Sequence, residues 1–322
     1  MREQPLVGIV VVNWRGEAQT ARCLKSLASL EYPSYRVCVV DNGSRDGGPE
    51  AVSAGFPWAD IVALPDNRGY AGGCNAGIAW ARSIGAEYVW LLNNDTTVES
   101  DALSRMVRWS LSAAGDGSIV APQIIATQTG RIWSAGGFIR RPWFKADHYG
   151  IGEPASGGGK PRPVEWASGC SLLFSLRTAD KVGPLDERYF LYLEDADWCL
   201  RAAKRGVQTW YTPDAVIKHE VSSTTGALDS RIVRYYAYRN HYLLAFAHSS
   251  LVGRAWFSAH LTFTLAKIAF RSLSSPSHRR DSYYQARTRA IFDFLRGRSG
   301  KAPFPDTFEP SLKGERVTGV VA

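Results

Sequence analysis

The sequence has few cysteines and no pair of them spaced as Cys-x-x-Cys. Its five cysteines are scattered and odd in number, so neither a disulfide framework nor a cysteine-based zinc site is expected, and a reducing compartment is the default. Long apolar runs are also missing. The longest uncharged stretches, Gly117–Gly130 and Asn240–Gly253, have 14 residues each, whereas about 18 apolar residues are typical of a membrane span. The apolar run ending at Val12 is too short and too early for a secretory signal. We therefore expect a soluble or surface-bound protein in the cytoplasm.

Acidic residues are scarce toward the C-terminus. Residues 231–301 contain thirteen Lys and Arg but two Asp and Glu, a net charge of +11, whereas the rest of the chain carries −3. This asymmetry indicates a nearly neutral body followed by a cationic segment that meets an anionic partner. Basic residues interleaved with Tyr, Phe and Leu suit an anionic surface on the inner face of the cell membrane as well as they suit nucleic acid. We rank nucleic acid low.

What the N-terminal part does contain is an alternation of short apolar runs and helical patterns. Helices are expected at Glu17–Leu30 and Ala71–Ser83. Alternating strands and helices of this length predict an α/β fold with a mostly parallel sheet flanked by helices, and the length permits one large domain or two smaller ones. The runs predicted as buried strands are Leu6–Val12, Val37–Val40, Ile61–Leu64 and Tyr88–Leu92.

Each of these four strands ends in polar residues. Asn13 follows the first strand, Asp41 the second, Asn67 is close to the end of the third, and Asn93-Asn94-Asp95 follow the fourth. Ligands of an open parallel sheet bind beyond the carboxyl ends of its strands. Ordinary turns and helix caps are the alternative for each cluster alone, but their repetition predicts one shared site.

The second half of the sequence is less regular. Strands are expected at Ile119–Ile125, Arg131–Ile139 and Trp166–Leu176, and a loop at Gly150–Lys160. A helix at Ala196–Arg205 puts Glu194 and Asp195 at its N-terminus, where both could also be charges that the helix dipole favours. Further elements are a short helix and two strand segments leading to His219, namely Thr178–Val182, Val207–Tyr211 and Ala215–Lys218.

Five motifs in this order carry a resemblance to a known family. The chain resembles family-2 inverting glycosyltransferases of the GT-A fold, and among them the bacterial rhamnosyltransferase-like enzymes of cell-wall and O-antigen assembly. The match covers roughly residues 5–245. The motifs are Val12-Asn13-Trp14, Val40-Asp41-Asn42-Gly43-Ser44, Asn67-Arg68-Gly69-Tyr70-Ala71-Gly72-Gly73-Cys74-Asn75, Leu92-Asn93-Asn94-Asp95-Thr96 and Glu194-Asp195-Ala196-Asp197-Trp198-Cys199-Leu200-Arg201.

The resemblance implies a role for each matching residue. Asp41 would accept a hydrogen bond from a pyrimidine ring, with Asn13 beside it. Asp95 would bind Mg²⁺ or Mn²⁺ on the diphosphate, with His219 as a further ligand or as a structural residue. Asp195 would deprotonate the acceptor hydroxyl, and Glu194 is the reserve candidate. The remaining residues of the nucleotide-sugar pocket would be Asn67, Arg68, Gly69, Asn75 and Asn94.

One departure from the family pattern concerns the metal. The commonest motif is Asp-x-Asp, but position 93 is Asn, so one carboxylate fewer should weaken metal affinity. The chemistry of the residues otherwise agrees with sugar transfer. A metal can neutralise the departing diphosphate, and inversion needs a base on the opposite face of the sugar. Glu194 and Asp195 are neighbours, so their repulsion can raise one pKa toward a useful range.

The resemblance also implies substrates and a domain plan. Thymidine-diphosphate rhamnose is the first candidate donor, and a glycan or polyprenyl-diphosphate-linked glycan the acceptor; self-association stays open. Residues 1–230 would be the catalytic domain, with the nucleotide-sugar half at 1–100 and the acceptor half at 101–230. A helical extension at 231–300 and a tail at 301–322 would follow.

Two other functions are the alternatives to sugar transfer. A nicotinamide oxidoreductase also uses a parallel sheet, but Asn13-Trp14-Arg15-Gly16 stands where its Gly-x-Gly-x-x-Gly would follow the first strand. A non-catalytic nucleotide-sugar-binding or scaffold subunit is the alternative from another class. The presence of both Asp95 and Asp195 argues against it.

Overall fold

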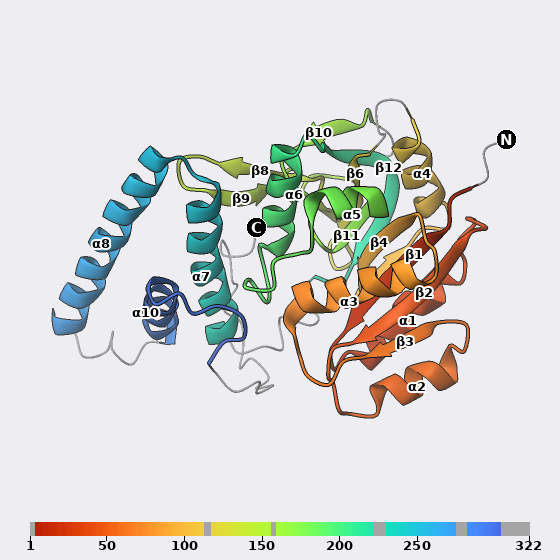
Figure 1. The fold of residues 1–322 in the computed structure, drawn as a ribbon, viewed down its shortest axis with the longest axis horizontal. Coiled ribbons are helices and arrows are strands. Elements are labelled where there is room, and N and C mark those ends of the chain that lie inside the picture. The colour runs from red at the N-terminus through yellow and green to blue at the C-terminus, as the bar shows by residue number, and fades with distance from the viewer. Residues whose placement is uncertain (1–3, 113–116, 156–158, 222–229, 275–281, 304–322) are drawn as a thin grey trace. The chain divides into compact units, whose positions relative to one another are not determined.

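The structure is a computed structural model, which divides the chain into two compact units (Figure 1). The first unit comprises residues 1–139, 146–187 and 194–221, and the second comprises residues 140–145, 188–193 and 222–322. The second unit thus takes in residues 140–145, 188–193 and 222–230, which the sequence assigned to the catalytic domain. Most of the expected tail lies outside the described residues. The structure describes residues 4–112, 117–155, 159–221, 230–274 and 282–303.

The first unit is built on a mixed sheet whose main path runs β10-β12-β6-β11-β4-β1-β2-β3. Strands β4, β1, β2 and β3 are parallel neighbours, and β6 and β12 form a second parallel pair. Strand β11 lies antiparallel between β4 and β6. The predicted α/β fold with a mostly parallel sheet is therefore confirmed. The strands on this path are β1 (Val7–Asn13), β2 (Tyr35–Asp41), β3 (Asp60–Ala63), β4 (Tyr88–Asn93), β6 (Ile119–Ala126), β10 (Arg162–Val164), β11 (Ser171–Ser175) and β12 (Thr209–His219).

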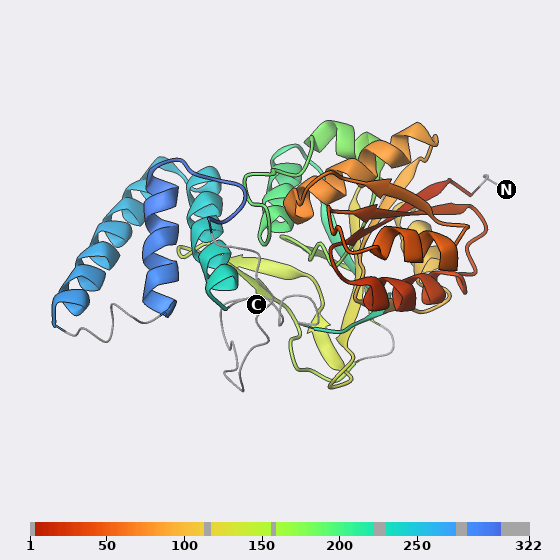
Figure 2. The ribbon, with the colours of Figure 1, turned by 90° about the horizontal axis from the view of Figure 1, so that it is seen from below.

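Helices cover both faces of this sheet, as Figure 2 shows from below. Helices α1, α2 and α4 pack on one face, where their apolar side chains share a core with alternate residues of the central strands, such as Ile9 and Val11. Helices α3 and α6 pack on the other face, where Trp198 of α6 contacts Phe174 of β11 at 4.6 Å between ring centroids. The helices of this unit are α1 (Glu17–Leu27), α2 (Gly48–Gly55), α3 (Gly69–Ser83), α4 (Ala102–Ser110), α5 (Leu176–Val182) and α6 (Glu194–Lys204).

Two glycines allow α3 to lie close to β1. A Cβ on Gly77 would lie 2.0 Å from a methyl of Val10, and one on Gly73 would lie 2.6 Å from a methyl of Val12. Real side chains do not approach so closely, so any larger residue would push the helix off the strand. This close approach fixes the N-terminal end of α3 beside the end of β1.

Some elements differ from their predictions. Instead of one strand at Arg131–Ile139, the chain forms β7 (Arg131–Ser134) and β8 (Gly137–Arg140), because Gly136 turns it with φ +74°. Strand β8 pairs with β9 (Lys145–His148), and β5 (Thr96–Val98) pairs with β12.

Two further predictions were wrong in extent, and one helix had no prediction. The expected strand at Trp166–Leu176 is confined to β11, because the chain turns before it where Ser171 N–H donates to the Ser168 carbonyl. The two expected segments before His219 are one strand, β12, with a bulge between Thr212 and Val216. Helix α2 was not expected.

The cysteines all lie in the first unit. Each of them is buried and free, and burial raises the pKa of each thiol, to about 12 for Cys23, Cys38 and Cys199. They act as small apolar core residues. The positions are Cys23, Cys38, Cys74, Cys170 and Cys199.

The second unit consists mainly of helices α7 (Ser230–His248), α8 (Leu251–Ser274) and α10 (Ser282–Leu295), which lie side by side in Figure 2. Tyr242 of α7, Leu261 and Ile268 of α8, and Ile291 of α10 share one buried apolar cluster. The prediction of helical segments after residue 231 is confirmed. Within the described ranges, no helix combines the length and apolarity that crossing a membrane requires.

Helix α7 also holds the segment 188–193. Arg239 is fully buried and donates hydrogen bonds to the carbonyls of Arg188 (2.9 Å) and Tyr189 (2.8 Å), and its neighbour Asn240 donates to the carbonyls of Tyr189, Leu191 and Tyr192. The segment needs this support because the backbone of three of its residues lies in the left-handed region, with φ of 66° to 70°. This conformation costs a residue other than glycine about 1 kcal/mol or more. These residues are Phe190, Tyr192 and Leu193.

Candidate functional site

The carboxyl ends of β1, β2 and β4 lie next to one another in the first unit. Asn13, the last residue of β1, is in register with Asp41, the last residue of β2, and Val12 is in register with Asn93 of β4. The parallel sheet thus brings to one edge the polar residues that follow these three strands.

Asp41 lies in a network of hydrogen bonds. Its Oδ1 accepts from Asn13 Nδ2 at 3.2 Å, and its Oδ2 accepts from the Ser44 backbone N–H at 3.1 Å. Asn13 Oδ1 in turn accepts from the Gly16 N–H and from Thr20 and Asn94. Both Asn13 and Asp41 are buried. The carboxylate is therefore held in one orientation by the chain itself.

The loop after β3 is fixed against the same edge. Asn42 Nδ2 donates to Asn67 Oδ1 at 3.2 Å and to the Gly69 carbonyl at 2.9 Å, and its Oδ1 accepts from the Arg68 N–H. Asn67 Oδ1 also accepts from the Gly69 N–H at 2.8 Å. These bonds set the start of α3 beside Asp41.

Two residues predicted to line the pocket bind a protein carboxylate in this structure. Arg68 pairs with Glu187 at 2.9 Å, with both side chains partly exposed, and Asn75 Nδ2 donates to Glu187 and to the Leu185 carbonyl. Arg68 and Asn75 thus tie α3 to the 185–187 loop. Their contact with a nucleotide sugar stays a prediction.

Asp95 and His219 form a buried pair. Asp95 Oδ1 lies 3.2 Å from His219 Nε2, and both side chains are less than a tenth exposed. The pairing of β12 with β5 places His219 opposite Thr96. Trp133 packs edge-on against the His219 ring, 4.7 Å between centroids. Burial lowers the pKa of His219, but the neighbouring thiol of Cys170 and the Asp95 carboxylate raise it by more, to about 10.

The Asp95 and His219 pair is suited to a divalent cation as part of a larger ligand set. Carboxylate oxygen and the nitrogen of a neutral imidazole are both ligands of Mn²⁺, so His219 would bind a cation only after losing its proton, and carboxylate is preferred by Mg²⁺. Across the described ranges, no group of three or more His, Cys, Asp and Glu side chains is arranged to hold a metal. The two residues therefore fit a cation only if the substrate supplies further oxygens, since the Asn at position 93 adds no carboxylate.

Glu194 and Asp195 begin α6 but occupy different environments. Glu194 is 4% exposed, and its Oε2 has no hydrogen-bond partner among the described residues. Asp195 is partly exposed, and its two oxygens accept from the backbone N–H groups of Gly169 and Ala196, each at 2.7 Å. Burial, together with the charge of Asp195, raises the pKa of Glu194 well above its usual value. Burial also raises the pKa of Asp195, although the hydrogen bonds from the two N–H groups lower it. Asp195 is the better placed of the two to act on a substrate.

Cys170 connects the two acidic groups. Burial raises the pKa of its thiol, the His219 side chain lowers it, and the charges of Asp95 and Asp195 both raise it. Its carbonyl accepts from the Asn93 N–H at 3.0 Å. The structure therefore places the Asp95 and Asp195 carboxylates in one neighbourhood, around a residue of the turn between Trp166 and β11.

The buried carboxyl of Glu194 leads to a pH-dependent prediction. Because its pKa is raised in the folded state, the folded chain keeps a proton that the unfolded chain releases. The stabilising effect is complete below the unfolded pKa, about 4.3, and is lost as pH rises toward the folded pKa, by about 1.4 kcal/mol per pH unit. Glu194→Gln cannot ionise, so its free energy of unfolding should rise relative to the parent between pH 4 and pH 7.

Urea unfolding at several pH values would measure this difference. Glu17→Gln, an exposed carboxylate in the first turn of α1, is the control and should show a nearly constant difference. The amide group adds a buried donor, which changes stability by the same amount at each pH and does not alter the trend. If the free energy of unfolding of Glu194→Gln relative to the parent falls with rising pH, Glu194 is not protonated in the folded chain.

Sequence reasoning missed several residues of this region. Glu187 contacts Arg68 and Asn75, which lie more than a hundred residues earlier in the sequence, and no local pattern predicts that contact. Gly169 contributes to Asp195 through its backbone N–H, while Tyr70 donates to the Gly169 carbonyl at 2.6 Å. Trp133 had no signal beyond its aromatic character. Ser44 and Tyr70 could have been recognised, because each stands inside one of the quoted motifs.

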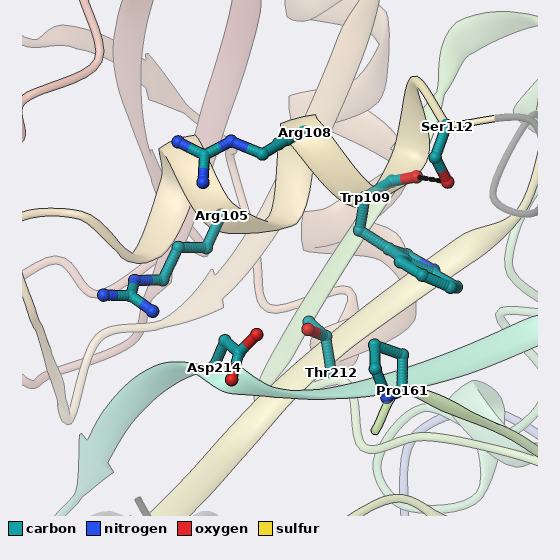
Figure 3. Close-up of a pocket in the computed structure, with 7 residues that line it drawn as sticks. All are labelled: Arg105, Arg108, Trp109, Ser112, Pro161, Thr212 and Asp214. Carbon is teal, nitrogen blue, oxygen red and sulfur yellow. Dashed lines mark hydrogen bonds between the residues drawn. The ribbon is translucent and has the colours of Figure 1, made fainter. Parts of the chain in front are cut away.

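A shallow pocket of about 200 Å³ lies elsewhere on the first unit (Figure 3). Side chains of α4 form one wall and residues of β12 the other. Arg105 in this wall is paired with Asp101 at 2.6 Å. None of the predicted site residues contributes to the pocket, so we assign it no part in the chemistry. Its lining residues are Arg105, Arg108, Trp109, Ser112, Pro161, Thr212 and Asp214.

Two curated relatives share much of the sequence. The chain is 30% identical over 288 residues to N-acetylglucosaminyl-diphospho-decaprenol L-rhamnosyltransferase of Mycobacterium tuberculosis, covering 82% of this chain and 91% of that protein. It is 21% identical to the dTDP-rhamnosyl transferase RfbF of Shigella flexneri, covering 73% and 78%. These relatives agree with the rhamnosyltransferase-like character that the motifs indicated.

The fold and the family models agree with these relatives. The mannosyltransferase PcManGT from Pyrobaculum calidifontis, solved with GDP-Man and Mn²⁺, matches 92% of this chain and 89% of its own with a TM-score of 0.57 at 17% identity. The predicted GT-A fold is thereby confirmed. The model of glycosyl transferase family 2 matches residues 7–158, and that of glycosyl transferase family group 2 matches residues 88–286. This chain therefore belongs to glycosyltransferase family 2, among its rhamnosyltransferase-like members.

Proposed function

We propose that this chain transfers L-rhamnose, with inversion and with the help of a divalent cation, from thymidine-diphosphate rhamnose to a hydroxyl of a polyprenyl-diphosphate-linked glycan in cell-wall or O-antigen synthesis. The observation that carries the proposal is the placement of two carboxylates, Asp95 beside His219 and Asp195 at the start of α6, around Cys170. The named activities of the relatives support the choice of sugar and acceptor.

The residues divide the reaction between them. Asp195 takes the proton of the acceptor hydroxyl, whose oxygen then forms the new bond to the anomeric carbon as the bond to the diphosphate oxygen breaks. The two backbone N–H groups that hold Asp195 orient its carboxylate and favour its ionised form, against the effect of burial on its pKa. Asp95 and His219 hold the cation, which when bound neutralises charge on the departing diphosphate. Asn67, Arg68, Gly69, Asn75 and Asn94 surround the donor.

The proposal is tested with a panel of donors. Thymidine- and uridine-diphosphate sugars, including thymidine-diphosphate rhamnose, would be incubated with Mg²⁺ or Mn²⁺ and a short polyprenyl-diphosphate-linked N-acetylglucosamine. We expect rhamnosyl transfer, abolished by a chelator and restored by adding the cation back. Transfer of another sugar would overturn the donor assignment alone. Full transfer in the presence of chelator would overturn the metal assignment.

Asp41 provides a prediction about the nucleotide. Its carboxylate can accept from N3–H of thymine or uracil, which adenine and cytosine lack. Asp41→Ala should weaken binding of thymidine diphosphate by about 1.5–3 kcal/mol, the range for a hydrogen bond to a charged group. Binding of adenosine diphosphate, measured by the same titration calorimetry, should change little.

Ser44→Ala is the matched control for Asp41. It removes the hydroxyl that donates to Asp41 Oδ1 at 2.5 Å but leaves the carboxylate, so thymidine diphosphate should bind within a few fold of the parent. Equal losses for both nucleotides in Asp41→Ala would mean that the residue supports the loop, and unchanged affinity would remove it from the site.

A further inference from the structure

Helix α8 of the second unit has apolar side chains on two opposite faces. On the inner face Phe257, Leu261 and Ile268 are less than a tenth exposed and pack toward α7 and α10. On the outer face Val252, Phe263 and Phe270 are 80%, 67% and 71% exposed. Large apolar side chains rarely gather on a surface without a function.

The exposed apolar residues form one continuous strip. At the helical rotation of 100° per residue, six outer positions fall within an arc of about 80°, and no polar residue whose side chain is described interrupts them. The strip runs along nearly the whole length of the 24-residue helix. We call it the outer strip, and it consists of Val252, Ala255, Ala259, Phe263, Ala266 and Phe270.

Basic side chains accompany the outer strip. Lys267 and Arg271 are exposed and lie on one flank of it, and α8 has no acidic residue in its sequence. Among the described residues of the second unit the one carboxylate side chain is that of Asp293, which is buried and paired with Arg289 at 2.8 Å. The described surface of this unit is therefore cationic, without exposed acidic groups to balance it.

Aromatic residues lie on the same flank. Trp143, from the segment Arg140–Lys145, is 47% exposed and packs against Trp256 and His260 of α8 at 4.6 and 5.6 Å between ring centroids. The segment reads Arg-Arg-Pro-Trp-Phe-Lys, so it adds basic residues beside its Trp. Tryptophan is enriched at the level of lipid headgroups, where its ring is apolar and its N–H stays near water.

We infer that the outer strip of α8 binds the surface of an anionic lipid bilayer. Its apolar side chains enter the boundary between headgroups and acyl chains, with the helix in the plane of the membrane, while Lys267, Arg271 and the basic side chains of the Arg140–Lys145 segment meet the negative headgroups. The charge argues against a second copy of this chain as the occupant. A symmetric contact through the strip would bring cationic surfaces together without acidic partners.

The inference goes beyond the proposed transfer reaction and is tested without any sugar. The full chain would be sedimented with vesicles of phosphatidylcholine alone or with about a third phosphatidylglycerol, at low and high salt. We expect at least about tenfold tighter binding to the anionic vesicles, weakened by salt. Equal binding to both kinds of vesicle, or binding to neither, would overturn the inference.

Substitutions then locate the surface. The double variant Phe263→Ser with Phe270→Ser should lose at least about tenfold in binding to anionic vesicles, because both side chains would leave the lipid. Trp58→Ser removes an aromatic side chain of the first unit that is 44% exposed, and should bind as the parent does. Circular dichroism melting would check that each variant is folded.

Two outcomes would assign the strip differently. If the double variant binds vesicles like the parent, the strip does not contact lipid. If the parent dimerises in sedimentation velocity, and the double variant becomes monomeric without losing vesicle binding, the strip is a contact between copies of this chain. Either result would overturn the inference and leave the proposed transfer reaction unaffected.

Discussion

Asp195→Asn should reduce sugar transfer by about 10²–10⁴-fold, the usual contribution of a general base, while binding of donor and cation stays within a few fold of the parent. Asp95→Ala should lose metal-dependent donor binding as well as transfer. The two variants separate the roles because Asp195 is held by the Gly169 and Ala196 N–H groups, whereas Asp95 pairs with His219. Transfer would be measured in single turnovers and donor binding by calorimetry with Mn²⁺.

The amide in Asp195→Asn can destabilise the folded chain, so stability must be measured together with transfer. Its NH₂ group would face one of the two backbone N–H groups, so the thermal midpoint should be recorded for every variant. Asp101→Asn, on an exposed carboxylate paired with Arg105, should transfer at the parent rate. If Asp195→Asn is fully active and Glu194→Gln is inactive, the base is Glu194. If both are fully active, the inverting mechanism proposed here is wrong.

Arg239→Met should lower the free energy of unfolding by about 3–5 kcal/mol. The buried guanidinium donates to the carbonyls of Arg188, Tyr189 and Gly300 at 2.6 to 2.9 Å, and hydrogen bonds to a charged group contribute about 1.5–3 kcal/mol each. Methionine fills much of the volume but takes a charged donor away from each of the three carbonyls, of which those of Arg188 and Tyr189 keep their weaker bonds to the Gly300 N–H and to Asn240. Denaturant unfolding followed by circular dichroism would measure the loss.

Arg254→Met is the matched control, because Arg254 is exposed on α8, and it should change stability by less than about 0.5 kcal/mol. Hydrogen exchange of the amides in residues 188–193 gives a second measurement. Those amides should exchange faster in Arg239→Met, since the segment loses the bonds from Arg239 to its Arg188 and Tyr189 carbonyls. An unchanged midpoint with unchanged exchange would show that the segment does not depend on Arg239.

Strands β1, β2 and β4 of the first unit were predictable because each contains a short run buried on both faces. Asp41 and Asp95 were found for the same reason, since an apolar run that stops at a carboxylate marks the end of a parallel strand. His219 was harder. Its position beside Asp95 depends on β12 pairing with β5, a contact between residues more than a hundred positions apart, and only the family resemblance suggested it.

The second unit was predictable in charge but not in shape. The excess of Lys and Arg can be counted, whereas the outer strip of α8 is hidden in the sequence because the inner face of the same helix is equally apolar. A helix with two apolar faces gives a weak periodic signal. The hydrogen bonds of Arg239 to segment 188–193 could not be predicted either, because every residue has a backbone carbonyl and the sequence does not show which one Arg239 binds. Tertiary contacts determine both which face of α8 is exposed and which carbonyls Arg239 binds.

The burial of every cysteine in the first unit has a consequence for oxidation. A thiol with a raised pKa remains protonated near neutral pH, and a protonated, buried thiol reacts slowly with peroxides and alkylating agents. The folded first unit therefore resists thiol damage without any help from a reductant. Once that unit opens, all five thiols become reactive together. The second unit contributes none of them, so its own opening leaves the thiol chemistry of the chain unchanged.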